Sequence, residues 1–249
     1  MSRTVIVTGG SRGLGAAITK AFHAAGDNVL VAARNDSGLA RALGDRVRFQ
    51  RTDVRRPAEL RAAVDAAVAW TGRLDALVNN AGYSAWRRLG DIDEAFWADM
   101  LDTNLKSVLF ASQAAAKQLT RGGVIVNISS LAGKRGSANN SVYCASKFGV
   151  NGVTQALAKE LGPVGVRVNA VCPVYLRTDG LNDALRDARS PSGGGDVDKY
   201  LSDFAATQTA LGVLPAEEQV AATCVFLASP AAGAITGQCI NVDCGVLPQ

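Results

Sequence analysis

The chain has 249 residues, of which 48% are hydrophobic and 19% are charged. This composition excludes an intrinsically disordered protein and is sufficient for one large domain with a buried core. The formal net charge is only +4. The basic residues are scattered, in runs no longer than doublets such as Arg55-Arg56 and Arg87-Arg88, so a nucleic-acid partner is not expected.

The longest uncharged stretch, residues 219–242, is interrupted by Ser229-Pro230 and Gly233. It is expected to form a helix, a turn and a strand rather than a membrane span. The first residues lead into a strand pattern without the features of a secretory signal. Five cysteines match no zinc or redox spacing, and His23 is the one histidine, so free thiols, no metal site and a cytoplasmic location are expected.

Short β-branched runs alternate with longer alanine-rich helical patterns, which is typical of β-α units around a parallel sheet. We therefore predict an α/β fold: one Rossmann-type domain over residues 1–249, with a doubly wound sheet of about seven parallel strands and helices on both faces. The strands are expected at Thr4–Thr8, Asn28–Ala33, Val47–Arg51, Ala76–Asn79, Val124–Ser129, Arg167–Cys172 and Cys239–Val242. The helices are expected to begin near Gly13, Ser37, Pro57, Asp93, Asn104, Val142 and Pro215.

Residues 177–214 break this rhythm, because a glycine-rich stretch, residues 190–195, separates two helical patches. A long irregular segment in a compact domain is usually functional or disordered. We predict a substrate lid, with a plain surface insertion as the alternative. The apolar positions that favour folding over a site are Leu181, Leu185, Tyr200, Leu201 and Phe204.

A glycine-rich turn, Thr8-Gly9-Gly10-Ser11-Arg12-Gly13-Leu14-Gly15, joins the first strand to the first helix. Its glycines allow a tight turn and a close approach to a pyrophosphate, with free helix N–H groups directed at the negative charge. The spacing differs from the G-x-G-x-x-G fingerprint, so an ordinary tight turn is the alternative. Its position on the first strand of a β-α series favours a nucleotide.

The second strand ends in Ala33-Arg34, where an NAD site normally presents an acidic side chain to the ribose. A guanidinium suits a phosphate because it offers planar, charge-assisted donors, and Arg12 could approach the same group. The two arginines predict NADP rather than NAD. The alternative is that both are solvated surface residues, with Asp36 neutralising Arg34.

Helical periodicity places Tyr143 and Lys147 on one face of a helix, and Ser130 ends the fifth strand. A free tyrosine titrates near pH ~10, and a nearby ammonium stabilises the phenolate and lowers that pKa. The sequence thus indicates a proton-transfer site. Taken alone, the Tyr/Lys pair could equally be an amphipathic helix with a lysine that reaches solvent.

Together these motifs resemble the short-chain dehydrogenase/reductase family, in its short single-domain branch and NADP type. The resemblance extends over most of the chain, and the motifs come in the family's order. They are the turn Thr8–Gly15, Asp53-Val54, Asn79-Asn80-Ala81-Gly82, Asn104, Ser130, and Tyr143 with Lys147.

The resemblance implies four catalytic roles. Tyr143 would donate or accept the hydroxyl proton, and Lys147 would lower its pKa and hold the nicotinamide ribose. Ser130 would polarise the carbonyl, and Asn104 would anchor a water molecule in a proton relay. These roles agree with the chemistry, because hydride comes from the cofactor and the protein must orient it, supply a proton and stabilise charge on oxygen.

The resemblance also implies a cofactor site and a homotetramer formed partly by the helices near Asn104 and Val142. Asp53 and Val54 would hold the adenine, Asn80 would line the ribose, and Thr178 would meet the nicotinamide amide. The complete expected set is Gly9, Ser11, Arg12, Gly13, Leu14, Gly15, Arg34, Asp53, Val54, Asn80, Ala81, Gly82, Tyr143, Lys147, Pro173, Leu176 and Thr178.

Two positions depart from the family's pattern. Val174 follows Pro173 where the family usually has glycine, so it would be strained if this position needed positive φ; an ordinary backbone and a narrower pocket are expected instead. Cys244 stands where the family usually has the first glycine of Asp-Gly-Gly. Neither position transfers a proton.

The substrate pocket is expected to be lined by Ser130, Tyr143, Trp86, Arg135, Val174 and Tyr175. We predict an NADP(H)-dependent oxidoreductase that interconverts a ketone and a secondary alcohol, with a small polar, polyol-like or cyclic substrate. The alternatives are a 3-oxoacyl or polyketide-type ketoreductase and an NAD-dependent polyol or alcohol dehydrogenase. A non-catalytic NADP-sensing protein fits least, because Tyr143, Lys147 and Ser130 are all present.

Overall fold

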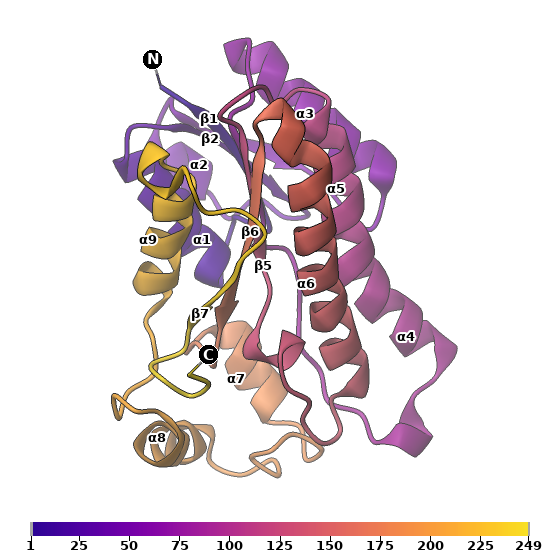
Figure 1. Cartoon of the computed structure of the whole chain (residues 1–249). Coiled ribbons are helices and arrows are strands. Elements are labelled where there is room, and N and C mark those ends of the chain that lie inside the picture. The colour runs from indigo at the N-terminus through magenta and orange to yellow at the C-terminus, as the bar shows by residue number, and fades with distance from the viewer. Residues whose placement is uncertain (1, 249) are drawn as a thin grey trace.

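A parallel sheet of seven strands lies at the centre of residues 2–248, the part of the chain that the computed structural model describes (Figure 1). The strand order is β3-β2-β1-β4-β5-β6-β7. The strands are β1 (Thr4–Thr8), β2 (Asn28–Ala33), β3 (Val47–Arg51), β4 (Ala76–Asn79), β5 (Val124–Ile128), β6 (Arg167–Pro173) and β7 (Cys239–Val242). The predicted doubly wound α/β fold is confirmed, and the predicted strand bounds differ only by one residue at the ends of β5 and β6.

The central strands are continuous apolar runs because helices cover both faces of the sheet. Every residue of β1, β4 and β5 is buried. The strand order reverses between β1 and β4, where Val5 pairs with Ala76 and Val7 with Val78. At such a switch point the connections leave the sheet in opposite directions and open a crevice at the carboxyl ends of the strands.

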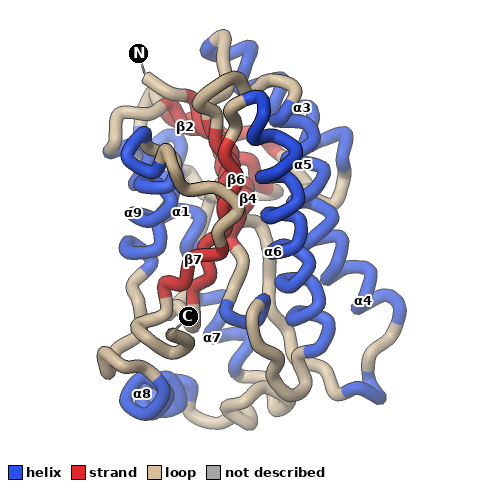
Figure 2. The backbone as a smooth tube through the Cα atoms, viewed as in Figure 1, coloured by secondary structure: helices blue, strands red, loops and turns tan. Residues whose placement is uncertain are grey.

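Helices cover the sheet in two layers (Figures 1 and 2). One layer contains α1 and α9 and buries Ile18, Phe22 and Leu227 against the sheet. The other contains α3, α5 and α6 and buries Leu60 and Val64 on the opposite face. The helices are α1 (Gly13–Ala24), α2 (Leu39–Leu43), α3 (Pro57–Thr71), α4 (Glu94–Leu101), α5 (Ser107–Ala116), α6 (Ser141–Leu161), α7 (Asp179–Leu185), α8 (Val197–Gln208) and α9 (Glu217–Leu227). Short 3₁₀ turns occupy Leu89–Asp91, Leu131–Gly133, Gly162–Val164 and Pro230–Ala232.

The helix predicted to begin near Asn104 does not begin there. Helix α4 passes into α5 through a π-helical turn, Asp102–Lys106, without a break in the chain's helical course. Asn104 has the residue type of a helix N-cap, but its side chain bonds to another loop and leaves the helix uninterrupted. The helices expected near Asp93 and Asn104 are therefore one element with a π turn at its middle.

Residues 177–214 form two helices, α7 and α8, joined by a turn that contains the predicted glycine-rich stretch. Leu185 and Leu201 are fully buried against Trp86, which comes from the loop after β4. The segment therefore has its own small core beyond the carboxyl ends of the strands, at the lower end of the molecule in Figure 2.

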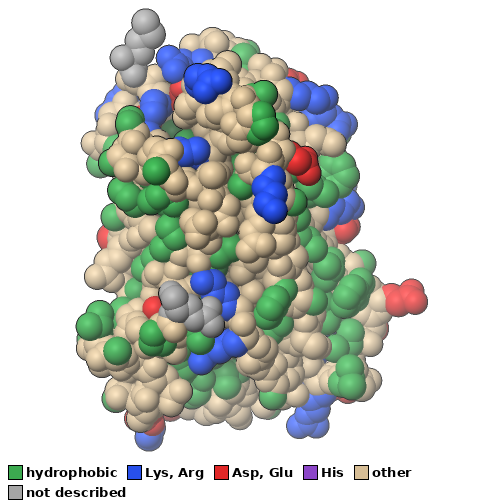
Figure 3. Space-filling model, viewed as in Figure 1, with side chains coloured by type: hydrophobic (Ala, Val, Ile, Leu, Met, Phe, Trp, Pro, Cys, Tyr) green, Lys and Arg blue, Asp and Glu red, His purple; other side chains and the backbone are tan. Residues whose placement is uncertain are grey.

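On the face shown in Figure 3, Lys and Arg side chains are scattered rather than gathered into one stripe. None of the helices within residues 2–248 combines the length and the apolar character needed to cross a lipid bilayer.

The two departures from the family pattern have different backbones. Among the described residues, the non-glycine positions with positive φ are Asn139 and Cys244, so Val174 has an ordinary backbone, as expected. Cys244 has a φ of 54° in the turn after β7. Because a Cβ atom disfavours this left-handed conformation, Cys244 is a locally strained residue.

Replacing Cys244 by glycine is expected to stabilise the fold. The left-handed conformation costs a non-glycine residue roughly 1–2 kcal/mol, and the added flexibility of glycine in the unfolded chain offsets about 0.5–1 kcal/mol of the gain. Cys244→Gly should therefore raise the free energy of unfolding by up to about 1 kcal/mol, measured by denaturant titration. Cys244→Ala removes the same thiol but keeps the strain, and equal stability of the two variants would contradict the assignment.

Candidate active site

The turn between β1 and α1 requires glycine at three positions. Gly9 has a φ of +65°, and a Cβ there would lie 3.0 Å from Ala81 Cα. Gly13 has a φ of +49°, and a Cβ on Gly15 would lie 2.1 Å from the Gly9 carbonyl oxygen. Arg12 precedes α1 without capping it through its side chain. The first N–H groups of α1 therefore face the crevice and can bind a phosphate group.

The loop after β4 is fixed to this turn by hydrogen bonds across the switch point. The backbone N–H groups of Asn80 and Ala81 donate to Thr8 Oγ1 at 3.0 and 3.1 Å. Asn80 Nδ2 donates to the carbonyl oxygens of Thr8 at 3.0 Å and Gly9 at 3.3 Å. The amide nitrogen of Asn80 thus shapes the glycine-rich turn between β1 and α1, which we call the phosphate turn. Only the amide oxygen of Asn80 is left to accept a hydrogen bond from a ribose hydroxyl.

The two arginines expected to read the 2′-phosphate are both exposed at this end of the sheet. Within residues 2–248, neither Arg12 nor Arg34 belongs to an ion pair. Asp36, the suggested neutraliser of Arg34, instead accepts a hydrogen bond from the Gly38 N–H at 2.8 Å. The charge of Arg34 contributes to lowering the pKa values of Asp53 and Asp99, so its guanidinium faces the proposed adenosine end of the crevice.

Asp53 belongs to a network that sequence reasoning missed. Arg55 binds the Asp53 carboxylate through Nη2 at 2.8 Å and the Asp99 carboxylate through Nη1 at 2.7 Å. The Tyr83 hydroxyl donates to Asp99 Oδ2 at 2.7 Å. The hydrogen bond from Arg55 is the main reason that the pKa of Asp53 falls to about 2. The i, i+2 spacing of Asp53 and Arg55 was a weak signal, but Asp99 and Tyr83 come from elements whose approach the sequence does not reveal.

Lys147 is a buried cation at the centre of the site. Its side chain is 5% exposed, and Nζ donates to the Ile128 carbonyl oxygen at 2.9 Å. Nζ lies 5.7 Å from the centre of the Tyr143 ring, and a Cβ on Gly82 would lie 3.6 Å from it. Burial lowers the pKa of Lys147 to about 8, so most molecules carry the ammonium at pH 7.

Tyr143 is protonated at neutral pH in this structure. Burial raises the pKa of Tyr143 to about 12, and the Ser130 hydroxyl, within hydrogen-bonding reach, offsets part of that rise. The expectation that Lys147 lowers this pKa below its ordinary value is not met, because loss of hydration is the largest influence on the phenol. The phenol therefore carries its proton at neutral pH.

Asn104 lies buried in the π turn, and its amide is bonded to the loop after β4. Asn104 Oδ1 accepts from the Tyr83 N–H at 3.0 Å, and Nδ2 donates to the Tyr83 carbonyl oxygen at 2.9 Å. Nδ2 also lies 3.3 Å from Ser146 Oγ. The side chain thus holds the backbone of the loop after β4. A π turn displaces a backbone carbonyl from its usual helical bond, and such a carbonyl could bind water here instead.

Aromatic side chains line the side of the site that faces α8. The Tyr175 and Tyr200 hydroxyl oxygens are 3.3 Å apart, and the Tyr175 and Phe204 rings meet edge to face with centroids 4.8 Å apart. Burial raises the pKa of Tyr175, Tyr143 raises it further, and the charge of Arg135 opposes the rise. Tyr175 therefore lies within electrostatic reach of both the Tyr143 phenol and Arg135.

The remaining predicted site residues lie in the segment after β6 or beneath α7 and α8. Pro173 and Leu176 are buried and Val174 is half-buried. The Thr178 methyl group is 3.7 Å from the position of a Cβ on Gly13, so this segment reaches the phosphate turn. Trp86 does not stand free in the pocket as expected: it is 3% exposed and packs on Leu185 and Leu201.

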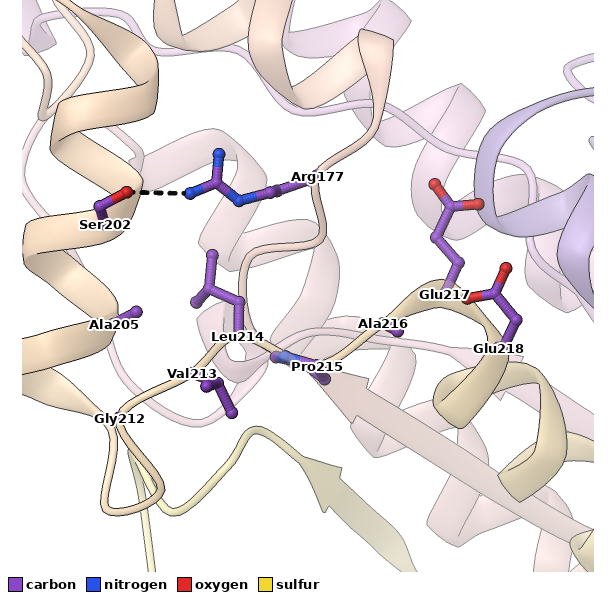
Figure 4. Close-up of a pocket in the computed structure, with 10 residues that line it drawn as sticks. All are labelled: Arg177, Ser202, Ala205, Gly212, Val213, Leu214, Pro215, Ala216, Glu217 and Glu218. Atoms are coloured by element: carbon purple, nitrogen blue, oxygen red, sulfur yellow. Dashed lines mark hydrogen bonds between the residues drawn. The ribbon is translucent and has the colours of Figure 1, made fainter.

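A separate hollow of about 730 Å³ lies behind this segment, away from Tyr143. Arg177 extends across it toward α8 and donates to Ser202 Oγ at 3.2 Å (Figure 4). The Arg177 guanidinium also pairs with Asp198 at 2.7 Å. Glu217 and Glu218, at the start of α9, lie at the far side of the hollow (Figure 4). These contacts connect α8 to the residue that precedes Thr178.

The fold and the Ser130, Tyr143 and Lys147 site define a dinucleotide-binding oxidoreductase. The family model described as enoyl-(acyl carrier protein) reductase matches residues 9–247. The chain belongs to the short-chain dehydrogenase/reductase family, whose members use a nicotinamide cofactor, and it is an enzyme that acts on CH-OH or C=O groups.

Relatives and solved structures match over nearly the whole chain. A protein of Streptomyces virginiae named as a monensin polyketide synthase ketoacyl reductase is 39% identical, over 99% of this chain and 97% of its own. A tryptophan variant of the actinorhodin polyketide ketoreductase with NADPH is 34% identical with a TM-score of 0.90, over 98% of this chain and 97% of its own. The aldohexose dehydrogenase of Thermoplasma acidophilum is 30% identical with a TM-score of 0.88, over 100% of this chain and 98% of its own.

The buried ammonium of Lys147 predicts a specific dependence of stability on pH. The folded pKa of about 8 lies below the ordinary value of 10.5, so the unfolded state binds more protons between these values. The free energy of unfolding should rise with pH across this window relative to Lys147→Met, by an amount on the order of 3 kcal/mol. Denaturant titrations of both proteins from pH 7 to 10 measure the difference, and parallel curves would contradict the buried charge.

Proposed function

We propose that the enzyme reduces a ketone to a secondary alcohol with NADPH, with Tyr143 as the proton donor. The observation that carries the proposal is the arrangement of a protonated Tyr143 between the Ser130 hydroxyl and the buried Lys147 ammonium. These three groups supply what carbonyl reduction requires from a protein: a proton, a donor to the carbonyl oxygen and a fixed positive charge.

The residues around the crevice fit a nicotinamide dinucleotide. The phosphate turn offers glycines where a Cβ would fill the space, and Gly82 leaves room beside Lys147 Nζ. Gly9, Ser11, Gly13, Leu14 and Gly15 would hold the pyrophosphate side. The adenosine side would be formed by Arg12, Arg34, Asp53 and Val54, and the nicotinamide side by Asn80, Ala81, Gly82, Tyr143, Lys147, Pro173, Leu176 and Thr178.

In the proposed mechanism, bound NADPH supplies the hydride. Ser130 Oγ donates to the substrate carbonyl oxygen and orients it beside Tyr143. The Tyr143 hydroxyl gives its proton to this oxygen as negative charge develops there, and the Lys147 ammonium stabilises the phenolate that results. Asn104 acts by holding the loop after β4, while a carbonyl of the π turn binds the water that returns a proton to Tyr143.

NADPH is proposed over NADH because of Arg12 and Arg34. Both arginines are exposed, belong to no ion pair within the described residues, and lie where the adenosine of the cofactor would bind. A ribose 2′-hydroxyl is normally held by an acidic side chain at the position of Arg34, and an arginine there would favour a 2′-phosphate. The actinorhodin ketoreductase structure, which holds NADPH, supports the same preference.

The aromatic wall favours a ketoacyl substrate over the small polar or polyol-like substrate expected from the sequence. Tyr175, Tyr200 and Phe204 offer flat apolar surface, whereas a sugar needs several fixed polar partners. The similar polyketide and fatty-acid ketoacyl reductases support this class. The aldohexose dehydrogenase supports the oxidation of a sugar hydroxyl as a second candidate.

We further propose that residues 177–214 act as a lid and that the enzyme is a homotetramer in the cytoplasm. The lid's own core with Trp86 would let it move as a unit. Helices α5 and α6 leave Leu109 and Phe148 42% and 48% exposed, which suits helix packing between subunits. Oligomeric state and compartment remain predictions from the family resemblance and the sequence.

Tyr143→Phe tests the proton-transfer role. The variant should bind NADPH as the wild type does and lose about 10²–10⁴-fold in kcat, since only the transferable proton is removed. NADPH oxidation is measured with acetoacetyl-CoA, and NAD(P)+ reduction with glucose. Turnover of glucose alone would replace the ketoacyl assignment with the sugar candidate. Near-normal turnover by Tyr143→Phe would overturn the proton-transfer role.

Arg34→Ala tests the choice of cofactor. NADPH should bind the wild type at least about tenfold more tightly than NADH, a difference of about 1.4 kcal/mol, and the variant should lose this margin while its NADH affinity stays the same. Fluorescence titrations with both cofactors measure the affinities. Arg41→Ala, which removes an exposed arginine on α2, is the matched control. Equal loss of both cofactors in Arg34→Ala would show that Arg34 does not read the phosphate.

A further inference from the structure

Two cysteines far apart in the sequence meet on neighbouring strands at the edge of the sheet. In the parallel pairing of β6 with β7, Cys239 lies opposite Ala170, and Cys172 is two residues further along β6. Because side chains alternate along a strand, residues 170 and 172 share one face, and Cys239 shares it with them. Cys172 and Cys239 are therefore diagonal neighbours on the same side of the sheet.

The side chains confirm this approach. The two thiols lie within hydrogen-bonding reach of each other. Cys172 is fully buried, and its sulfur lies 3.9 Å from Asn151 Oδ1 of α6. Cys239 is partly exposed. Cys239 is thus the more accessible residue of the pair, and Cys172 is the protected one.

A lysine lies beside the accessible thiol. Lys134 Nζ donates to the Cys239 carbonyl oxygen at 2.6 Å, and its charge reaches the neighbouring sulfur. Interaction with Cys172 is the main cause that lowers the pKa of Cys239, burial opposes it, and Lys134 lowers it further. A lowered pKa makes more thiolate available, and the thiolate is the form that reacts with peroxides.

We propose that Cys172 and Cys239 form a reversible oxidation site for peroxide. The Cys239 thiolate attacks one oxygen of hydrogen peroxide, which gives a sulfenic acid and releases hydroxide. The Cys172 sulfur then attacks the Cys239 sulfur, and the sulfenic oxygen leaves as water. Two thiols are oxidised to one disulfide, and one peroxide is reduced to two molecules of water. This site is independent of the proposed reduction of a ketone.

The strand geometry explains why the bond would be reversible. Neighbouring parallel strands lie about 4.8 Å apart and rise about 3.3 Å per residue, so diagonal partners have Cα atoms about 8 Å apart, more than the usual disulfide range of about 4.4–6.8 Å. Bond closure therefore draws β7 toward β6. Strand β7 is the edge strand of the sheet, and all four of its residues are only half-buried. A disulfide closed against this displacement is easily reduced again.

Peptide mapping of the full-length protein tests the proposal. Hydrogen peroxide treatment, followed by alkylation of the remaining thiols, should leave three of the five cysteines alkylated and link Cys172 to Cys239. No lysine or arginine follows Lys199, so chymotrypsin and a protease that cleaves before aspartate are needed to separate Cys239 from Cys224 and Cys244. Dithiothreitol should restore all five thiols.

Two variants complete the experiment. Cys239→Ser should leave Cys172 reduced under the same treatment, whereas Cys244→Ser should form the Cys172–Cys239 bond as the wild type does. The wild-type map is decisive even if a variant folds poorly. A sulfenic or sulfinic acid on Cys239 without the disulfide, a disulfide to another cysteine, a link between subunits, or five unreacted thiols would each overturn the proposal.

Discussion

The burial of the Lys147 ammonium is the constraint on which the rest of the site depends. A cation removed from water is tolerated only where the fold provides fixed dipoles, and here the Ile128 carbonyl oxygen at the end of β5 provides one. Ser129 Oγ also donates to the Lys147 carbonyl oxygen at 3.3 Å, so α6 is fastened to β5 at this point. The same helix presents Tyr143 one turn earlier. The position of the phenol thus follows from the bonds that hold its neighbouring lysine.

Side-chain hydrogen bonds and ion pairs connect the loop after β3 to helix α4 and to the loop after β4. Asp53 is joined through Arg55 to Asp99, and Asp99 receives the hydroxyl of Tyr83. The backbone of Tyr83 is held on both sides by Asn104. A charged network therefore links the end of β3 to the π turn between α4 and α5. Arg55 pairs with both carboxylates of this network. The charge of the nearby Arg34 also acts on Asp53 and Asp99.

The fold was predictable because the strands are short apolar runs with clear ends, and several of the family motifs follow those ends. The π turn was not predictable, because Asn104 has the residue type of an N-cap and its actual partner, Tyr83, is set by tertiary packing. Trp86 was placed in the pocket for its position after β4, but Leu185 and Leu201 of α7 and α8 cover it. The pKa of Tyr143 shows the same limit, since the burial that raises it is a property of the packed structure that spacing alone does not reveal.

The pairing of β1 with β4 also has a consequence for the order of folding. Thr8 and Asn80, whose hydrogen bonds shape the phosphate turn, are 72 residues apart in the chain. Contacts of such long sequence separation form slowly, because a large loop must close before any of them is gained. During synthesis, β1, α1 and β2 leave the ribosome well before β4 is available. The nascent chain therefore has a glycine-rich turn without its crevice, and the ability to hold a dinucleotide is gained only when the second half of the sheet docks on the first.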